Sequence, residues 1–273
     1  MWPYPKMIAH RGGGSLAPEN TIAAMRCGLQ HGFSGVEFDV MLSKDEVPIV
    51  MHDPQLGRTV TGSGSVADYS AHELTQLDAG AWFDERYAGE LVPTFEQVVT
   101  FCRANGIWMN IEIKPVPGFE EVTGRVVAET TARLFADVLE LKKNEAKNNA
   151  AVSDNARAVL PLFSSFSCEA LRAAQRTEPD IPRACLFDRV PLDWCEKLTS
   201  LGAVAIDTNH KYLSAKQAHA IKRAGFGLFC YTLNDPERAR EVLSWGVDAI
   251  CTDRIDLLGA DFAESKDQEV VER

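Results

Sequence analysis

Short apolar runs alternate with amphipathic segments along most of the chain. The runs are rich in β-branched residues, as buried parallel strands are, and most are followed by apolar positions at helical spacing. Eight strands are predicted, at residues 6–10, 35–44, 107–114, 160–166, 184–187, 203–207, 227–232 and 248–252. This order predicts an α/β protein with a (β/α)8 barrel of TIM type. A doubly wound open sheet is the structural alternative, because periodicity does not show closure.

The segments between these strands carry helix start and stop residues. Asn20, Thr94 and Ser167 are expected N-caps, and Gly202 and Gly225 are expected to end helices. The predicted helices span residues 21–30, 94–105, 119–142, 168–176, 192–200, 214–224 and 236–245, with a short one near 255–260.

Residues 54–92 interrupt the alternation. The segment begins with a loop rich in Gly, Ser and Thr, continues with a short helix over 70–77 that Ser70 and Glu73 cap, and ends in an aromatic run around Trp82. A segment of this length is typically a functional loop or small lid. We interpret 1–262 as one barrel domain that contains this insertion after strand two. Residues 143–158 are expected to form a solvated loop, and 263–273 a disordered tail.

Composition narrows the possible partners. The 273 residues carry a formal net charge of −11 and no block of five Lys or Arg, which argues against nucleic acid and against a broad anionic membrane surface. The seven cysteines are scattered without a CxxC pair, a pattern that suits a reducing compartment. With no secretory leader and no apolar span in view, we expect a cytoplasmic protein without stable membrane insertion. The sequence has no signature of an oligomeric state.

The stretch 35–54 concentrates chemistry in one predicted hairpin. Glu37 and Asp39 are two residues apart on a strand and therefore share a face. A turn centred on Asp45 and Glu46 would place Asp39 opposite His52, about 5 Å away. A slip of one residue would move His52 to the other face.

Further reactive groups lie at the predicted carboxyl ends of other strands, where barrel enzymes carry their active sites. His10 and Arg11 end the first strand, Glu112 and Lys114 the third, and Tyr231 the seventh. Asp207 and Asp253 end the sixth and eighth strands. Inward-facing charges must be paired, and a metal ion held by the carboxylates would achieve this.

Oxygen ligands without a soft ligand select Mg²⁺ or Ca²⁺. Two histidines beside that ion make a general acid and a general base. Arg11 suits bidentate contact with a phosphate, and Lys114 a point-charge contact. The alternative is a structural ion network of the same groups. Tyr231 and Trp82 suit either ligand stacking or core packing.

In their order along the chain, these segments resemble the glycerophosphodiester phosphodiesterases of the bacterial cytosolic type. The matching segments are IAHRGG (8–13), APENT (17–21), GVEFDV (35–40), KD and PIVMHD (44–53), NIEIK (110–114), LFSSF (162–166) and GVDAICTD (246–253). Each motif is short, but the ordered set is specific. On the late strand the family often has Trp-Thr, and this chain has Tyr231-Thr232.

The resemblance implies a TIM-type barrel whose small insertion is 54–92, and hydrolysis of glycerophosphodiesters such as glycerophosphocholine to sn-glycerol 3-phosphate and an alcohol. It implies three kinds of site residue. A divalent metal would be bound by Glu37, Asp39 and Glu112. Acid–base catalysis would come from His10 and His52, and phosphate contacts from Arg11 and Lys114. Tyr231 would supply an aromatic wall for the substrate. Rival interpretations are a lysophospholipase-like enzyme on the same barrel and a catalytically silent barrel that binds a metal or phosphate.

Overall fold

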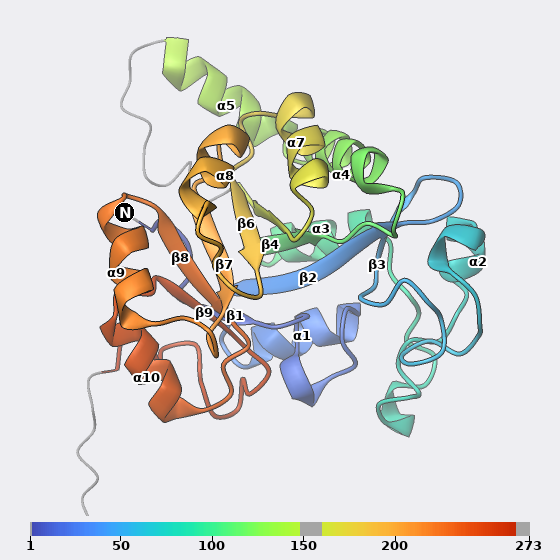
Figure 1. Cartoon of the computed structure of the whole chain (residues 1–273). Helices are drawn as coiled ribbons and strands as arrows, with labels where there is room; N and C mark the ends of the chain where they lie inside the picture. Colours follow the sequence, from blue (N-terminus) through green and yellow to red (C-terminus); the bar gives the residue numbers. More distant parts are fainter. Residues whose placement is uncertain (1, 148–159, 266–273) are drawn as a thin grey trace, which may run out of the picture.

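The computed structural model describes residues 2–147 and 160–265. Within them, eight parallel strands form a closed ring, because β1 pairs with both β9 and β2 (Figure 1). The barrel prediction is therefore confirmed over the open sheet. The strands are β1 (Met7–Ala9), β2 (Gly35–Leu42), β4 (Trp108–Ile113), β5 (Leu162–Ser165), β6 (Arg183–Phe187), β7 (Ala205–Asn209), β8 (Gly227–Tyr231) and β9 (Ala249–Thr252).

Helices surround this ring and bury its outer face. Strand side chains that point outward, such as Phe38 and Ile111, pack beneath the helices in the largest apolar core. Inward-pointing Ile8, Leu162 and Phe229 form a separate apolar floor inside the barrel. The helices are α1 (Ile22–Gln30), α3 (Phe95–Ala104), α4 (Glu120–Leu134), α5 (Ala136–Lys147), α7 (Cys168–Thr177), α8 (Trp194–Leu201), α9 (Ala215–Arg223) and α10 (Pro236–Ser244). No described helix is long and apolar enough to cross a membrane.

The predicted caps are largely confirmed. Thr94 and Ser167 accept hydrogen bonds from the first turns of α3 and α7, and Gly202 ends α8 in the left-handed conformation. The prediction for Asn20 is wrong. Thr21 caps α1, while Asn20 lies at a φ of 62° and uses its side chain to bind Asp39.

Two other predictions near helix ends are also wrong. The helix expected over 119–142 is divided at Phe135, whose φ of −114° ends α4 and whose ring is buried under Arg103. Helix α5 then continues to Lys147, so 143–147 are not loop; 148–158 lie outside the described residues. Residues 255–260 form hydrogen-bonded turns around buried Leu258 rather than a helix. Of the expected tail, 266–273 also lie outside the described part.

The hairpin exists, but its predicted register is wrong by one residue. Strand β3 (Pro48–Val50) pairs antiparallel with β2, with Val40 opposite Val50. Asp39 consequently faces Met51, whose N–H donates to its carbonyl at 3.1 Å. The turn is longer than predicted because the side chain of Ser43 bonds the backbone of Val47. His52 nonetheless reaches the interior, because it follows β3 in a bend.

Beyond β3 the insertion forms a side layer on the barrel, drawn at the right of Figure 1. It contains η2 (Val66–Asp68), α2 (Ala71–Leu74) and η3 (Glu85–Tyr87). Ser70 and Glu73 form the predicted capping box of α2. The small core of the insertion includes Met41 and Ile49 of the hairpin, and on this sharing we propose that the insertion belongs to the barrel domain.

Candidate active site

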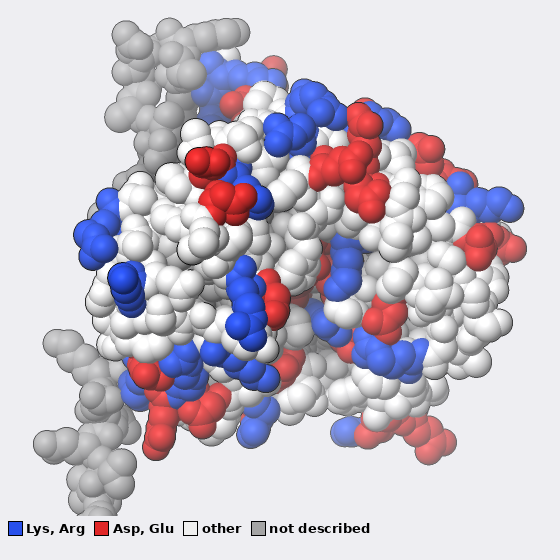
Figure 2. All heavy atoms as spheres, viewed as in Figure 1, with Lys and Arg blue, Asp and Glu red and all other residues white. Residues whose placement is uncertain are grey.

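The carboxyl ends of the strands enclose a cavity of about 260 Å³. Figure 2 shows a hollow near the centre of one face, with charged side chains of both signs around it. The cavity is lined by seven of the eight residues to which the sequence analysis assigned a metal, catalytic or substrate role, namely His10, Arg11, Glu37, His52, Glu112, Lys114 and Tyr231. It is also lined by Phe166, Leu186, Asp207, Thr232 and Cys251. Asp39 is 1% exposed and is not part of the cavity lining.

Glu37, Asp39 and Glu112 form the centre of the site. Adjacent parallel strands β2 and β4 place Asp39 beside Glu112 in register, and potential ligand oxygens of all three residues lie within 4.8 Å of one another. One buried oxygen of Glu37 and one of Glu112 have no hydrogen-bond partner. The group therefore offers free oxygen ligands at one point, as a hard cation requires.

The electrostatics of these carboxylates reflect their crowding. Burial and the neighbouring Asp39 raise the pKa of Glu37 well above its ordinary value, and the same two causes raise the pKa of Glu112 to about 7. Burial would also raise the pKa of Asp39, but Lys114 and Arg11 lower it. Without a cation, the neighbouring negative charge thus disfavours ionisation of two of the three carboxyl groups, Glu37 and Glu112.

Two side chains bring positive charge to this centre. The Nζ atom of Lys114 lies 3.4 Å from Asp39 and 3.7 Å from Glu112. The guanidinium of Arg11 bonds Glu19 at 2.6 Å and lies 3.5 Å from Asp39. The ion network considered from the sequence is therefore present in part. It is not balanced, since these two cations face four carboxylates.

The loop that carries Arg11 requires a close approach of backbone to helix α1. Arg11 has a φ of 50°, and its N–H donates to Glu37 at 3.1 Å. A Cβ atom on Gly28 of α1 would lie 2.3 Å from the carbonyl oxygen of Gly12. Glycine at position 28 therefore lets the loop sit close enough to the barrel to aim Arg11 inward.

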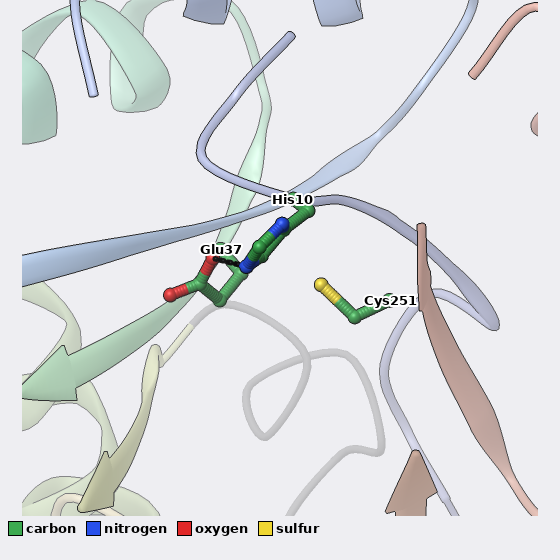
Figure 3. Close-up of side chains that lie close together, drawn as sticks. All are labelled: His10, Glu37 and Cys251. Carbon is green, nitrogen blue, oxygen red and sulfur yellow. Dashed lines mark ion pairs between the residues drawn. The ribbon is translucent and has the colours of Figure 1, made fainter. Parts of the chain in front are cut away.

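Each histidine is held by a carboxylate on its Nδ1 atom. His10 Nδ1 lies 2.5 Å from Asp253, and His52 Nδ1 lies 2.6 Å from Asp53. This pairing orients each ring and leaves its Nε2 atom for other contacts. His10 Nε2 is 3.8 Å from Glu37, and the dashed line in Figure 3 marks this ion pair. The pKa of His52 is lowered, chiefly by burial.

A thiol also lies near the site, which the sequence analysis did not anticipate. Figure 3 shows Cys251 of β9 beside His10 and Glu37, and these three residues form a second group with potential ligand atoms within 4.8 Å. Cys251 lines the cavity and belongs to the apolar floor inside the barrel, and burial raises the pKa of its thiol well above the ordinary value. We therefore assign it to the cavity wall rather than to a soft metal site.

Several residues of the site were missed from the sequence. Asp53 adjoins His52 and could have been selected by that adjacency. Glu19 and Arg58 belong to loops without periodicity. Arg58 bonds Asp53 at 2.5 Å and Glu19 at 2.8 Å through each terminal nitrogen. Asn234 donates to Asp253 at 2.9 Å.

The remaining wall of the cavity is largely apolar. The Tyr231 hydroxyl donates to the Phe187 carbonyl at 3.1 Å, and its ring meets Phe166 edge to face at 6.2 Å. Trp82 is not among the cavity-lining residues: it is 43% exposed and packs against Phe83. Of the two aromatics selected from the sequence, Tyr231 therefore lines the cavity.

The sequence model of the glycerophosphoryl diester phosphodiesterase family matches residues 10–257. The chain belongs to this family. Its members are phosphoric diester hydrolases, so the protein is an enzyme of that class. The chain is 30% identical to a glycerophosphodiester phosphodiesterase of Caldanaerobacter subterraneus, over 90% of this chain and 93% of the relative.

Solved structures agree with this membership. An Oleispira antarctica phosphodiesterase in complex with the product sn-glycerol-3-phosphate has a TM-score of 0.81 and 32% identity, and the match covers 96% of this chain and 97% of that one. A glycerophosphodiester phosphodiesterase of Agrobacterium tumefaciens has a TM-score of 0.70 and 27% identity, with 96% and 100% covered. The family resemblance inferred from the motifs is thereby confirmed.

Proposed function

We propose that the protein hydrolyses glycerophosphodiesters, such as glycerophosphocholine and glycerophosphoethanolamine, to sn-glycerol 3-phosphate and an alcohol. The observation that carries this proposal is the meeting of two carboxylate-oriented histidines, His10 and His52, with a trio of acidic ligands in one cavity. The product complex of the Oleispira relative supports the choice of substrate class. The seven cysteines, all free thiols, support a cytoplasmic location as part of the proposal.

The acidic trio fits one divalent hard cation, Mg²⁺ or Ca²⁺. The donors are all carboxylate oxygens, and the free oxygens of Glu37 and Glu112 would be satisfied by such an ion. When bound, the cation polarises the phosphoryl oxygens and stabilises the charge that develops on them. Arg11, fixed by Glu19, and Lys114 bind further oxygens of the phosphate.

The histidines move the protons. One imidazole removes a proton from the attacking oxygen, and the other delivers a proton to the departing alkoxide. The attacking oxygen belongs either to water or to the glycerol 2-hydroxyl, which would form a cyclic phosphate first. Asp253 and Asp53 hold the two rings in place and stabilise the imidazolium that each reaches in turn.

Small soluble diesters fit this site better than lysophospholipids do. A lipid substrate would need an exposed apolar lip leading to the cavity. Among the exposed large apolar side chains of the described residues, only Phe166, at 54% exposed, lines the cavity, whereas Trp82 and Leu91 of the insertion do not, so no extended apolar lip leads to it. The net charge of −11 also disfavours an anionic lipid surface.

The test is hydrolysis of glycerophosphocholine by the purified protein, coupled to detection of glycerol 3-phosphate, with Mg²⁺, with Ca²⁺ and with EDTA. We expect release of glycerol 3-phosphate that requires a cation and is lost in the Glu37→Gln variant. Folded protein that is silent with every added cation would contradict the proposal and favour lipid-linked diesters as substrates or a binding role.

A further inference from the structure

Asp207 is a buried carboxyl group, one of whose two oxygens has no partner on the protein. It lies on β7 with 2% of its surface exposed, and its Oδ1 atom has no hydrogen-bond partner. Two residues earlier on the same strand, Ala205 belongs to the floor inside the barrel. Alternation along β7 therefore points Asp207 into the barrel, where it lines the cavity.

The surroundings of Asp207 satisfy this group only in part, through the backbone of Thr208. Leu186 and Phe229 are its register neighbours on β6 and β8, and Leu186 lines the cavity beside it. The Tyr231 hydroxyl is already bonded to Phe187. Burial, and after it the charge of Glu112, raise the pKa of Asp207 well above its ordinary value. A buried polar group that the protein leaves free in a cavity indicates a hydrogen bond to a ligand.

The geometry of the cavity indicates which part of the ligand would bond to Asp207. The phosphate-binding groups Arg11 and Lys114 belong to the β1 and β4 side, whereas Asp207 is on β7. A glycerophosphodiester has one constant substituent, glycerol, and one variable head group. Asp207 is 2% exposed, and so deep a position suits the constant substituent, since the variable one needs the open mouth of the cavity.

We propose that Asp207 determines specificity by hydrogen-bonding a hydroxyl of the glycerol moiety. The inference rests on the proposed function and adds a residue that selects polyol substituents over plain alkyl ones. It does not depend on the charge state of Asp207, because a carboxylate accepts from a hydroxyl and a carboxylic acid both donates to it and accepts from it.

Binding of two phosphate monoesters tests the assignment without turnover. Calorimetry in the presence of Ca²⁺ would compare sn-glycerol 3-phosphate with propyl phosphate, which lacks both hydroxyls. We expect the wild type to prefer glycerol 3-phosphate by about 10- to 100-fold, the range for hydrogen bonds to a charged or unpaired buried group. Asp207→Ala should abolish most of this preference, and Asp207→Asn, which keeps a donor and an acceptor, should retain most of it.

Thr208→Ala is the matched control. Thr208 is the next residue, is equally buried and also has an unpartnered hydroxyl, but it does not line the cavity. An equal preference in wild type and Asp207→Ala would overturn the inference, as would an equal loss in Thr208→Ala. If Asp207→Ala does not fold, the isosteric Asp207→Leu replaces it.

Two outcomes separate this inference from the proposed function. A wild type that binds both monoesters equally, yet releases glycerol 3-phosphate from glycerophosphocholine, refutes the role of Asp207 alone. A wild type that binds neither monoester and releases no glycerol 3-phosphate from glycerophosphocholine refutes the proposed function as well. If Asp207→Ala instead weakens phosphoethanolamine relative to propyl phosphate, Asp207 faces the head group and the inference is wrong.

Discussion

Replacing Arg58 by Met should slow the enzyme although Arg58 does not line the cavity. Arg58 comes from the insertion and bonds two carboxylates, Asp53 and Glu19. Asp53 in turn holds His52 at 2.6 Å, and Glu19 holds Arg11 at 2.6 Å. Arg58 therefore contacts His52 and Arg11 only through one intervening carboxylate each. Methionine has a similar length and cannot make any of these bonds.

The effect on stability can be worked from Asp53. Burial would raise its pKa, but Arg58 and His52 lower it from 3.8 to about 2, a difference equivalent to about 2 kcal/mol. Because the Arg58 side chain is 45% exposed, screening by water reduces this, and we expect a loss of about 1 kcal/mol in the free energy of unfolding. A carboxyl group whose pKa is lowered in the folded state stabilises the protein at pH values above the ordinary pKa of that group. The difference between wild type and variant should therefore be full at pH 7 and shrink as the pH falls from about 4 towards 2.

The effect on activity comes from the freedom that Asp53 and His52 gain. Loss of such a supporting partner typically costs 10–100-fold, and because Asp53 itself remains we expect a fall in kcat of about tenfold. KM should change less, since Arg11 is still bound by Glu19 and Asp39. The assays are steady-state kinetics on glycerophosphocholine and urea denaturation at several pH values.

Arg86→Met is the control for this prediction. Arg86 also belongs to the insertion and pairs with Asp84 at 3.0 Å, but its side chain is 81% exposed. We expect this variant to match the wild type in both kcat and stability. An unchanged kcat in Arg58→Met, or an equal fall in Arg86→Met, would refute the reasoning.

Three further predictions concern the residues that line the cavity and their supports. His10→Ala and His52→Ala should each lose most of kcat with little change in melting temperature, and near-normal turnover would remove that residue from the mechanism. Asp253→Asn removes the charge facing His10 and should lower kcat by on the order of 100-fold. His10 lowers the pKa of Asp253 against the effect of burial. The free energy of unfolding of the variant should therefore be lower than that of the wild type at pH 7, and this difference should disappear as the pH falls below the ordinary pKa of the carboxyl group towards its lowered folded-state pKa. Ca²⁺ or Mg²⁺ at about 100 times its Kd should stabilise the protein by roughly 2.7 kcal/mol, and Glu37→Gln should abolish that response in thermal melts.

The barrel could be predicted because its strands and helices follow strict local patterns. Outward strand residues such as Phe38 and inward ones such as Glu37 alternate, and the N-caps Thr94 and Ser167 mark helix starts within a few residues. Where one residue changes the pattern, prediction failed. Phe135 fits a helical stripe as an apolar residue, but the sequence does not show that it ends one helix and starts another.

The hairpin shows how a prediction can fail locally and still select the right residue. The register was set by assuming a two-residue turn. Ser43 extends that turn by bonding Val47, and Glu46 accommodates it with a φ of 58°. His52 remains in the site because it lies beyond the end of β3, where strand alternation no longer applies.

The ion-pair network around Arg58 lay outside the reach of sequence reasoning. Arg58 and Glu19 are separated by 39 positions and both lie in irregular loops, so no periodicity brings them together. Asp207 presents a different difficulty. The sequence predicts it at the end of a strand, whereas β7 continues to Asn209, and only the packing around Asp207 reveals that its Oδ1 atom has no partner.

The charge arrangement of the site explains why a protein of net charge −11 can act on an anionic diester. If all three ionise, Glu37, Asp39 and Glu112 carry more negative charge than Arg11 and Lys114 balance, and burial makes that excess costly. A divalent cation would offset the excess and leave Arg11 and Lys114 available to a phosphate. The acidic trio that would repel the substrate in the empty site would therefore, with a cation bound, favour binding of the anionic substrate there.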